Sequence, residues 1–472
     1  MTHPNTHLSA RHNIRDEQQR GKPIFVTRLS ENSKFFMKRD IFKPEIFRSC
    51  LIDWVLRDRI SFHQIESEPF REMIASLRPE ALEVLNCANT IRAHCLQRFQ
   101  VARENIQQLF TTAKSKIHIS ADLWTSLNNY ALLGIVAHWW DMNDNLQSAL
   151  IALPKLYGSH TGANIGKAII DTLDLYNITE KLGYFMLDNA SSNDTAVEAI
   201  TTEFRHHRLS RTITSKEARL RCSRHIINLV VRSLFFGTSV EALQLDSVEF
   251  ETWRRIGPIG RLHNTIRRVR GSPQRRKRFL GFQSNDSDSD LEPLMARQNN
   301  DTRWDSTFNM INRALKPQVR RAIDKFIDSA IEELSTKQER EDLEADRLEE
   351  ADWSMLENIH EILAPFHTMT KELQGNIGET QMNGAIFDVL PCMDFLLQQL
   401  ETVKEIYTES PILASCINLA WSKLNKYYEA TDDSSVYATA VMLDPRLKRQ
   451  YFDRNWKQSW IDKAESNFKR LV

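Results

Sequence analysis

The sequence predicts a mixed α/β core that is preceded by a helical region and followed by a long, almost wholly helical region. Two observations predict this. Between about residues 116 and 187, short apolar runs rich in aromatic and β-branched residues are separated by polar turns, whereas beyond about residue 217 the pattern is helical. The composition agrees, because 41% hydrophobic and 26% charged residues are ordinary for a soluble globular chain.

The core is predicted from the order of its elements. The polar turns at Leu127–Asn129 and Asn143–Asn145 would join three strands into an antiparallel meander. An amphipathic helix over 162–177, a brief strand and a further helix from about Asn193 follow. The four strands are expected at Lys116–Ala121, Tyr130–Trp140, Leu146–Leu156 and Tyr184–Leu187. Strand, strand, strand, helix, strand, helix is the order of the ribonuclease-H-like fold.

A chain of 472 residues has room for two to four domains of roughly 100–200 residues each. We expect a flexible, polar and basic N-terminal arm at 1–40 and a helical N-terminal region at 41–112. The ribonuclease-H-like core is expected at 113–235, with a mixed five-stranded sheet, and a mainly helical insertion domain at 236–472. The insertion contains a basic segment at 254–278 and an acidic loop at 284–292.

Charge is balanced over the whole chain, since Lys and Arg number 62 and Asp and Glu also number 62. Attraction for nucleic acid must therefore come from local clusters. The basic segment 254–278 holds ten Lys or Arg and no acid, so it could track a DNA backbone. The run Arg275, Arg276, Lys277 and Arg278 equally suits a nuclear-import signal. A solvated basic helix is the plain alternative.

Cysteine usage and hydropathy exclude several classes of protein. The six cysteines are too sparse for a disulfide scaffold and include no CxxC pair of the zinc-finger type. The first thirty residues hold no apolar run of signal-peptide length, and nowhere do about 18 apolar residues follow one another. We therefore expect an intracellular, soluble protein with no membrane partner.

Two aspartates are the leading candidates for chemistry. Asp122 is expected at the end of the first strand and Asp188 at the end of the fourth. In a ribonuclease-H-like fold these strands are neighbours, so the two carboxylates would lie side by side and call for a divalent cation. Mg²⁺, with carboxylate and water ligands, suits phosphodiester chemistry. The alternative is that each Asp only caps a turn or a helix.

Six blocks of sequence, in the same order, resemble those of the hAT superfamily of DNA transposases, most closely its fungal members. They are Ala121–Ser126 (D-x-W-T-S), Leu153–Gly162 (L-P…G-x-H-T-G), Leu187–Asp194 (D-N-A-x-N-N-D), Arg221–Leu229 (C-x-x-H-x-x-N-L), Asp301–Thr307 (T-R-W-N-S-T) and Ala440–Lys448 (A-x-x-L-D-P-R-x-K). An upstream segment, Glu66–Pro79, extends the resemblance. No single block is specific, but the ordered set spans about 120 to 450.

The resemblance implies a metal-dependent enzyme that cleaves and transfers DNA strands. Asp122 and Asp188 would be catalytic and metal ligands of a D-D-E triad that holds Mg²⁺ or Mn²⁺. His225 would lie beside the active site, although a buried Cys222 and a hydrogen-bonded His225 are as good an account. Cys222 and His225 alone make no structural zinc site, because two ligands are too few.

The same resemblance implies a role for the block at 301–307. Arg303 would contact phosphate, and Trp304 would stack on a base flipped out of the duplex. A core tryptophan beside an exposed arginine is the alternative. The implied partners are DNA, namely transposon ends and flanking DNA, in the nucleus, and the resemblance leaves open a homo-oligomer of the full-length form.

The sequence also departs from the family pattern. Members generally begin with a zinc-binding BED finger, and residues 1–60 lack the Cys/His pairs it needs. The third acid lies in a block, S-A-x-x-E-R-x-F-S, that this sequence does not contain. We therefore expect an incomplete triad and a core that lacks its C-terminal helix. The alternative function is a catalytically inactive, domesticated or truncated module that binds DNA or protein.

Overall fold

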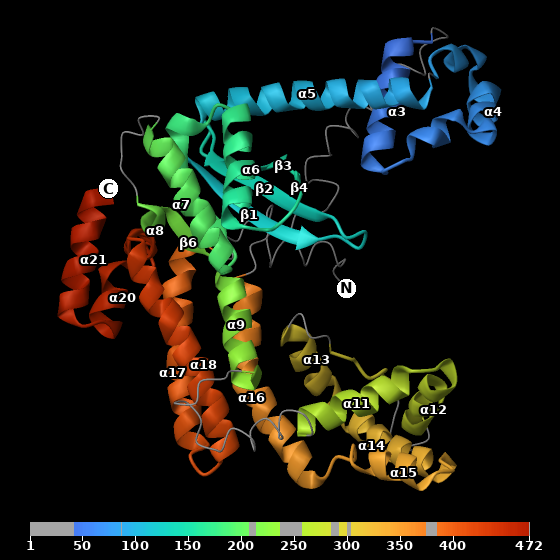
Figure 1. Ribbon diagram of the computed structural model, residues 1–472, viewed down its shortest axis with the longest axis vertical. Helices are drawn as coiled ribbons and strands as arrows, with labels where there is room; N and C mark the ends of the chain where they lie inside the picture. The colour runs from blue at the N-terminus through green and yellow to red at the C-terminus, as the bar shows by residue number, and fades with distance from the viewer. Residues whose placement is uncertain are drawn as a thin grey trace, which may run out of the picture. The chain divides into compact units, whose positions relative to one another are not determined.

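The computed structural model describes residues 42–206 except 86, and then 214–236, 257–284, 292–299, 304–373 and 385–471. The chain divides into two compact units, Met1–Gln108 and Leu109–Val472 (Figure 1). Several predictions lie outside the described residues: the arm at 1–40, the first residues of the basic segment at 254–256, most of the acidic loop, and Arg303.

All regular elements in the described part of the first unit are helices. Its elements are α3 (Pro44–Arg57), η1 (Phe62–Glu66), α4 (Glu68–Leu77), η2 (Pro79–Glu83) and α5 (Ala88–Thr112), the last of which ends in the second unit. Apolar side chains of these helices form a small core of their own.

The upstream family-like segment explains how the first unit is held together. Phe70 is buried in the core of that unit. The Glu66 carboxylate accepts a hydrogen bond of 2.8 Å from the backbone N–H of Ala88, at the start of α5, and this bond lowers the pKa of Glu66. Arg71 donates to the carbonyl of Leu85 at 3.1 Å. The segment therefore has a structural role here.

The second unit is built on a mixed sheet whose strands lie in the order β3-β2-β1-β5-β6, with β4 beside β2. The strands are β1 (Ile117–Thr125), β2 (Ala131–Trp140), β3 (Leu146–Ala152), β4 (Lys155–Leu156), β5 (Leu182–Leu187) and β6 (Arg219–Arg221). The first three form the predicted antiparallel meander, and β5 and β6 join it in parallel. Parallel neighbours need crossover connections, which helices supply here.

The structure corrects the expected strands in three places. β1 continues past Ala121 to Thr125 because its pairing with β2 continues, so Asp122 lies within the strand and not at its end. The expected third strand is two strands, β3 and β4, separated at Pro154, which has no N–H for a ladder. β6, only three residues long, was not predicted as a separate strand within the stretch read as helical.

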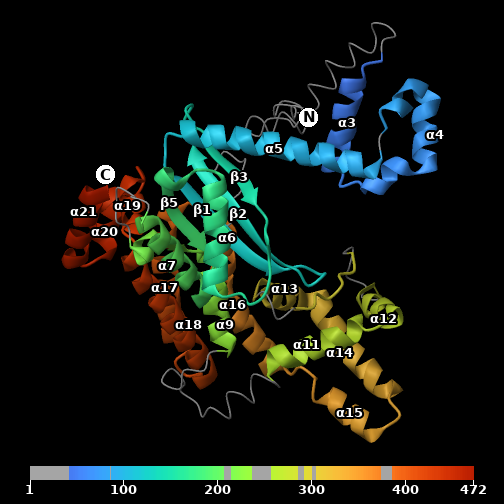
Figure 2. The same ribbon diagram turned by 45° about the horizontal axis from the view of Figure 1, so that its top comes forward.

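Two helices pack side by side over the sheet, α6 (Gly162–Leu175) and α7 (Ser191–His206) (Figures 1 and 2). Both match the predicted helices. Their close approach depends on Gly162, where an added Cβ would lie 2.4 Å from the carbonyl oxygen of Ser192 and closer still to Thr195. The short helices η3 (Thr179–Lys181) and α8 (Ser215–Ala218) precede β5 and β6.

Beyond β6, all regular structure in the described residues is helical, as predicted. The helices are α9 (Ser223–Phe236), α11 (Pro258–Arg270), α12 (Pro273–Ser284), α13 (Trp304–Ala314), α14 (Pro317–Glu333), α15 (Lys337–Glu344), α16 (Glu350–Glu372), η5 (Ile386–Asp388), α17 (Val389–Ile406), α18 (Pro411–Glu429), η6 (Ala430–Asp433), α19 (Val436–Leu443), α20 (Lys448–Asn455) and α21 (Gln458–Leu471). No helix in the described part of the chain is long and apolar enough to cross a membrane.

These helices form two groups that share α16. In one group α9, α17 and α18 pack together, and in the other α11 to α15 do so (Figure 1). α16 contacts α9 and α17 in the first group and α11 and α13 in the second. One continuous apolar core runs from Leu220 in β6 through both groups to Ile461 in α21. The start of α9 and the start of α13 are thereby held by the same core.

Candidate functional site

The register of the sheet brings the two predicted aspartates together. Ser120 of β1 pairs with Met186 of β5 in parallel register, and Asp122 and Asp188 each lie two residues further along. Side chains alternate along a strand, so both carboxylates project from the same face of the sheet. Neighbouring strands are about 4.8 Å apart, which makes the two carboxylates adjacent. Asp122 is exposed and Asp188 is half-buried.

The carboxylate of Asp188 is held in a defined orientation. Its Oδ1 accepts a hydrogen bond of 2.9 Å from the backbone N–H of Ala190 and another from the side-chain amide of Asn193. Arg219, which is 5% exposed, donates to the backbone carbonyls of Leu187 and Asp188. The end of β5 is therefore fixed both by its own turn and by a buried guanidinium from β6.

A cavity of about 720 Å³ opens over this face of the sheet. Asp122, Asp188, His225 and Trp304 all line it, so four of the predicted site residues converge on one cleft. The strands β1, β2, β3 and β5 supply one part of the wall, and the first turns of α9 and α13 supply the other. Its remaining lining residues are Ser120, Ala121, Trp124, Gly134, Val136, Leu150, Met186, Leu187, Cys222, Arg224, Asn228, Arg232 and Asp305.

Sequence reasoning missed Trp124 as a candidate. Its side chain is 42% exposed and its ring lies against Gly134, where a Cβ would come within 3.1 Å of the indole. The missing side chain at 134 thus leaves room for the ring. The strand period could have revealed it, because Ser120, Asp122 and Trp124 alternate onto one face of β1. Trp124 is an open aromatic surface beside the carboxylates.

Asn228 and Arg232 on α9 were also missed. They follow the predicted His225 at spacings of three and four residues, so the three side chains share one face of the helix. Asn228 Oδ1 is buried without a hydrogen-bond partner among the described residues. A buried polar atom without a partner is unusual and points to a ligand or water that satisfies it. Arg224, in the first turn, adds a second guanidinium to this wall.

Trp304 borders the cleft with only a small part of its ring. It is 5% exposed and meets the rings of Phe308 and His367 edge-on, at centroid distances of 6.3 and 6.2 Å. Oδ1 of the neighbouring Asp305 lies 3.4 Å from Nδ1 of His367. Stacking of a flipped base on Trp304 stays a prediction.

The basic cluster at 275–278 lies on α12, and its four side chains differ in what they contact. Arg275, Arg276 and Lys277 are exposed to solvent. Arg278 instead turns toward α14, where its ion pair with Glu333 raises the pKa of the guanidinium. None of the four lines the cleft. A solvent-facing set of three cations therefore remains for a phosphate backbone.

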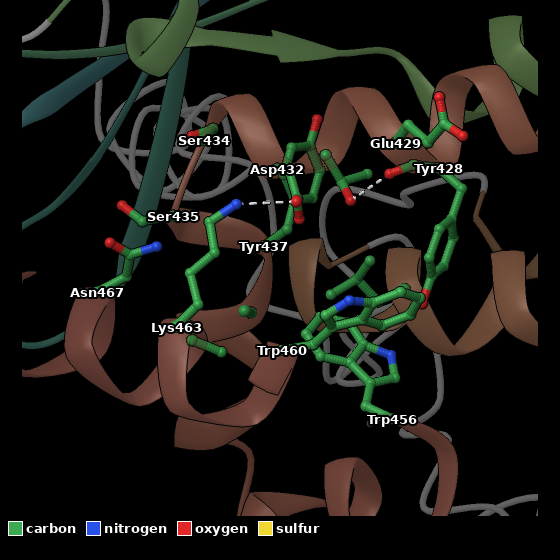
Figure 3. A pocket seen from close by; sticks show the side chains of 14 residues that line it. Tyr428, Glu429, Asp432, Ser434, Ser435, Tyr437, Trp456, Trp460, Lys463 and Asn467 are labelled. Atoms are coloured by element: carbon green, nitrogen blue, oxygen red, sulfur yellow. Dashed lines mark hydrogen bonds and ion pairs between the residues drawn. The ribbon is translucent and has the colours of Figure 1, made fainter. Parts of the chain in front are cut away.

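A second cavity, of about 230 Å³, lies among the C-terminal helices and contains no predicted site residue. Figure 3 shows Trp456 and Trp460 at one side and Lys463 reaching toward Asp432, with which it forms an ion pair of 3.0 Å. The charged groups of this pair satisfy one another. The cleft over the sheet is therefore the stronger candidate.

Comparison with known proteins gives two family matches. The ZBED1 RNase-like domain matches residues 120–213, and the ZBED1 RNase-like helical domain matches residues 220–362. Together they cover the sheet, α9 and most of the helical region that closes the cleft. The chain is a hAT-type transposase-like protein.

Individual relatives of this hAT-type protein agree. It is 26% identical over 87% of its length to the transcriptional regulator tpeD of Talaromyces stipitatus, covering 45% of that protein. It is 24% identical over 84% of its length to an AC transposase of Zea mays, covering 44% of it. It is 20% identical over 87% of its length to the zinc finger BED domain-containing protein RICESLEEPER 2 of rice, covering 51% of it. The chain thus spans about half the length of these relatives.

The donor set of this hAT-type protein was tested for a divalent cation. Asp122 and Asp188 offer carboxylate oxygens on one face, and Mg²⁺ is commonly held by one or two carboxylates while water and substrate phosphate complete its shell. No group of three or more His, Cys, Asp or Glu suited to a metal occurs within the described ranges. Asp305 borders the cleft but does not join the pair as a third ligand. Among the described residues, the side chains that fit the cation are therefore the two aspartates, Asp122 and Asp188.

Proposed function

We propose that this protein binds DNA in the cleft over β1 and β5 and cleaves and transfers DNA strands there in a metal-dependent reaction. The observation that carries this proposal is the adjacency of Asp122 and Asp188 on one face of the sheet, inside a cleft that also holds His225, Arg224 and Arg232. The mixed sheet would be a ribonuclease-H-like core, and the helices beyond β6 an insertion that completes the cleft.

Each part of the cleft has a task in this proposal. A divalent cation, Mg²⁺ or Mn²⁺, held by Asp122 and Asp188 would activate the attacking oxygen and stabilise the leaving one. Arg224 and Arg232 would bind the scissile strand through its phosphates. The start of α9 faces the same space, and the N-terminus of a helix favours anions. His225 would contact the scissile strand from this wall.

The DNA partner is supported by the kinds of protein that are similar to this chain. Transposases and a transcriptional regulator are among them. We propose DNA, including transposon ends and their flanks, as the partner and the nucleus as the location. The exposed side chains of Arg275, Arg276 and Lys277 suit either a DNA backbone or a nuclear-import signal.

A nicking assay tests catalysis. Purified protein is incubated with supercoiled plasmid in MgCl₂ or MnCl₂ and, separately, in EDTA. We expect nicking that needs the cation and is lost in Asp122→Asn and Asp188→Asn, while Asp171→Asn on the exposed side of α6 retains it. Equal nicking by Asp122→Asn and the unchanged protein would reject the assigned carboxylates.

A second candidate function is a DNA-binding module without catalytic activity. It is favoured by one observation, that only two carboxylates form the candidate metal site in the described residues. Salt-dependent DNA binding in EDTA that survives Asp122→Asn, together with no nicking by the unchanged protein, would select it over the first proposal.

A further inference from the structure

A separate open cavity of about 600 Å³ lies beside α13, and the described residues that line it all have polar side chains. They are Arg270, Arg297, Gln298, Asn299, Ser306 and Asn309. Arginine offers only donors, and amides and hydroxyls can donate as well. None of these described lining residues carries a carboxylate. Such a set is built to receive an anion, and above all one with several acceptor oxygens.

Three arginines in and beside this cavity have no acidic partner among the residues that the structure describes. Arg270, Arg297 and Arg313 form no ion pair with any residue in the described ranges. Arg313 donates to the carbonyl of Met295 at 3.3 Å, and burial together with the nearby charge of Arg297 lowers its pKa. Arginines held close together without an acid gain stability when an anion enters.

The polar cavity and the cleft meet at the start of α13. Trp304 and Asp305 line the cleft, whereas Ser306 and Asn309 of the same helix line the polar cavity. At 1.5 Å per residue, Trp304 and Asn309 are about 7.5 Å apart along the helix axis, roughly the rise of two nucleotides in a DNA strand.

On its other side the polar cavity is continuous with the exposed cations of α12. Arg276 donates from Nε to the backbone carbonyl of Arg270 at 3.1 Å. Arg270 in turn donates to the carbonyl of Ala296 at 3.0 Å, which fixes the segment 292–299 against α11. The order along the surface is therefore the cleft, the polar cavity and then the exposed face of α12.

We propose that this polar cavity binds a backbone phosphate of the same DNA strand that occupies the cleft, about two nucleotides from the position beside Trp304. The inference rests on the proposed function, because it assumes that DNA occupies the cleft. It adds a binding site made by Arg270 and Arg297, apart from the cations at 275–278. The strand would pass over the start of α13 and continue toward α12.

The test compares charge-removing variants in a DNA-binding titration. The probe is a fluorescein-labelled single-stranded oligodeoxynucleotide of 20 nucleotides, followed by fluorescence anisotropy in EDTA between 50 and 200 mM salt. Arg297→Gln is the first variant, because Arg297 makes no hydrogen bond or ion pair among the described residues and its replacement leaves the fold alone. Arg270→Gln/Arg297→Gln is the second. Arg340→Gln is the control, since Arg340 is exposed on α15 and lines neither cavity.

We expect the salt slope of log K to fall by about 0.7 for each lost phosphate contact on a single strand. The double variant loses the one phosphate contact of this cavity, so its loss of affinity over this fourfold range of salt should shrink by about 2.6-fold relative to the unchanged protein. Arg297→Lys should restore most of the slope, and Arg340→Gln should not change it. A slope for Arg297→Gln equal to that of Arg340→Gln overturns the proposal.

Two further measurements are needed. One distinguishes a DNA phosphate from free phosphate as the ligand of the cavity, and the other distinguishes failure of this proposal from failure of the proposed function. The first measurement is calorimetry with inorganic phosphate. If Arg297→Gln loses phosphate binding but keeps the salt slope of DNA binding, the cavity is a site for free phosphate and the DNA assignment is overturned. Reduced slopes in the arginine variants with no cation-dependent nicking would retain this site and reject catalysis. Absence of DNA binding by the unchanged protein would reject both.

Discussion

Replacing Asp122 with Asn should change thermal stability in opposite directions with and without a divalent cation. The register of β1 and β5 makes Asp122 and Asp188 neighbours across a strand spacing of about 4.8 Å. Two unit charges about 5 Å apart repel by roughly 0.8 kcal/mol in water and by about 3 kcal/mol at an effective dielectric constant of 20. Because Asp122 is exposed, the lower figure applies. Asp122→Asn should therefore stabilise the cation-free protein slightly.

With cation present the effect should reverse. A cation at one hundred times its Kd stabilises the native state by about 2.7 kcal/mol. For the unit Leu109–Val472, the usual entropy of unfolding per residue converts this into a rise in Tm of about 3–4 °C, and the relieved repulsion into about 1 °C. Asp122→Asn should thus melt about 1 °C higher than the unchanged protein in EDTA and lose most of the cation-dependent rise.

The assay is thermal unfolding followed by calorimetry in EDTA and over a series of MgCl₂ and MnCl₂ concentrations. Asp171→Asn makes the same charge change on the exposed side of α6 and should keep the full cation-dependent rise. The reasoning is refuted if Asp122→Asn responds to the cation as the unchanged protein does, or if it is markedly destabilised in EDTA.

Three further predictions concern a buried histidine, the two cleft tryptophans and the packing of α6. Burial lowers the pKa of His118, whose Nδ1 accepts the N–H of Tyr184 at 3.1 Å, so the unfolded chain binds a proton that the native state does not. The free energy of unfolding in urea should therefore fall as pH drops below about 6.5, by up to about 1.4 kcal/mol per pH unit. His118→Gln should make this dependence of unfolding free energy on pH less steep, and an unchanged dependence would contradict the prediction. Trp124→Ala should weaken single-stranded DNA binding about tenfold without changing Tm, because a base-stacking surface is lost. If Trp304→Ala instead weakens DNA binding without changing Tm, the base stacks on Trp304. Gly162→Ala should cost about 1–3 kcal/mol because its Cβ meets the backbone of α7, while Gly281→Ala, with open space around it, should be neutral or stabilising; similar melting curves for both would count against the close packing.

The strands and the aspartate pair could be predicted because their signals are local or topological. Alternation of apolar and polar residues is visible within a few positions, so the meander was found with small errors at its ends. The adjacency of Asp122 and Asp188 followed from strand order alone, and the structure has these strands paired. β6 was missed because three residues, with Arg219 and Arg221 at its ends, carry no periodicity.

Other features of the structure depend on partners that are distant in sequence and so could not be read from local patterns. Arg278 belongs to a run of four cations, yet it pairs with Glu333, which no local pattern reveals. The sequence predicts Trp304 to stack on a base beside a phosphate-contacting arginine, whereas in the structure helices distant in sequence enclose most of its ring. Some family-like blocks have structural tasks. In the L-D-P-R block the carboxylate of Asp444 accepts from Arg446 at 2.7 Å, and this contact lowers the pKa of Asp444.

The edge strand β6 and the helix α9 that follows it are held by residues that the ribosome synthesises much later. The backbone N–H of Arg221 in β6 donates to the hydroxyl of Tyr437 at 2.9 Å, 216 positions later, and the buried face of α9 packs against α18. Contacts of such high sequence separation slow folding. During translation, Val230 and Leu234 of α9, buried in the finished core, would be in water until α18 leaves the ribosome. A nascent chain halted near residue 236 should therefore be a chaperone client and prone to aggregate.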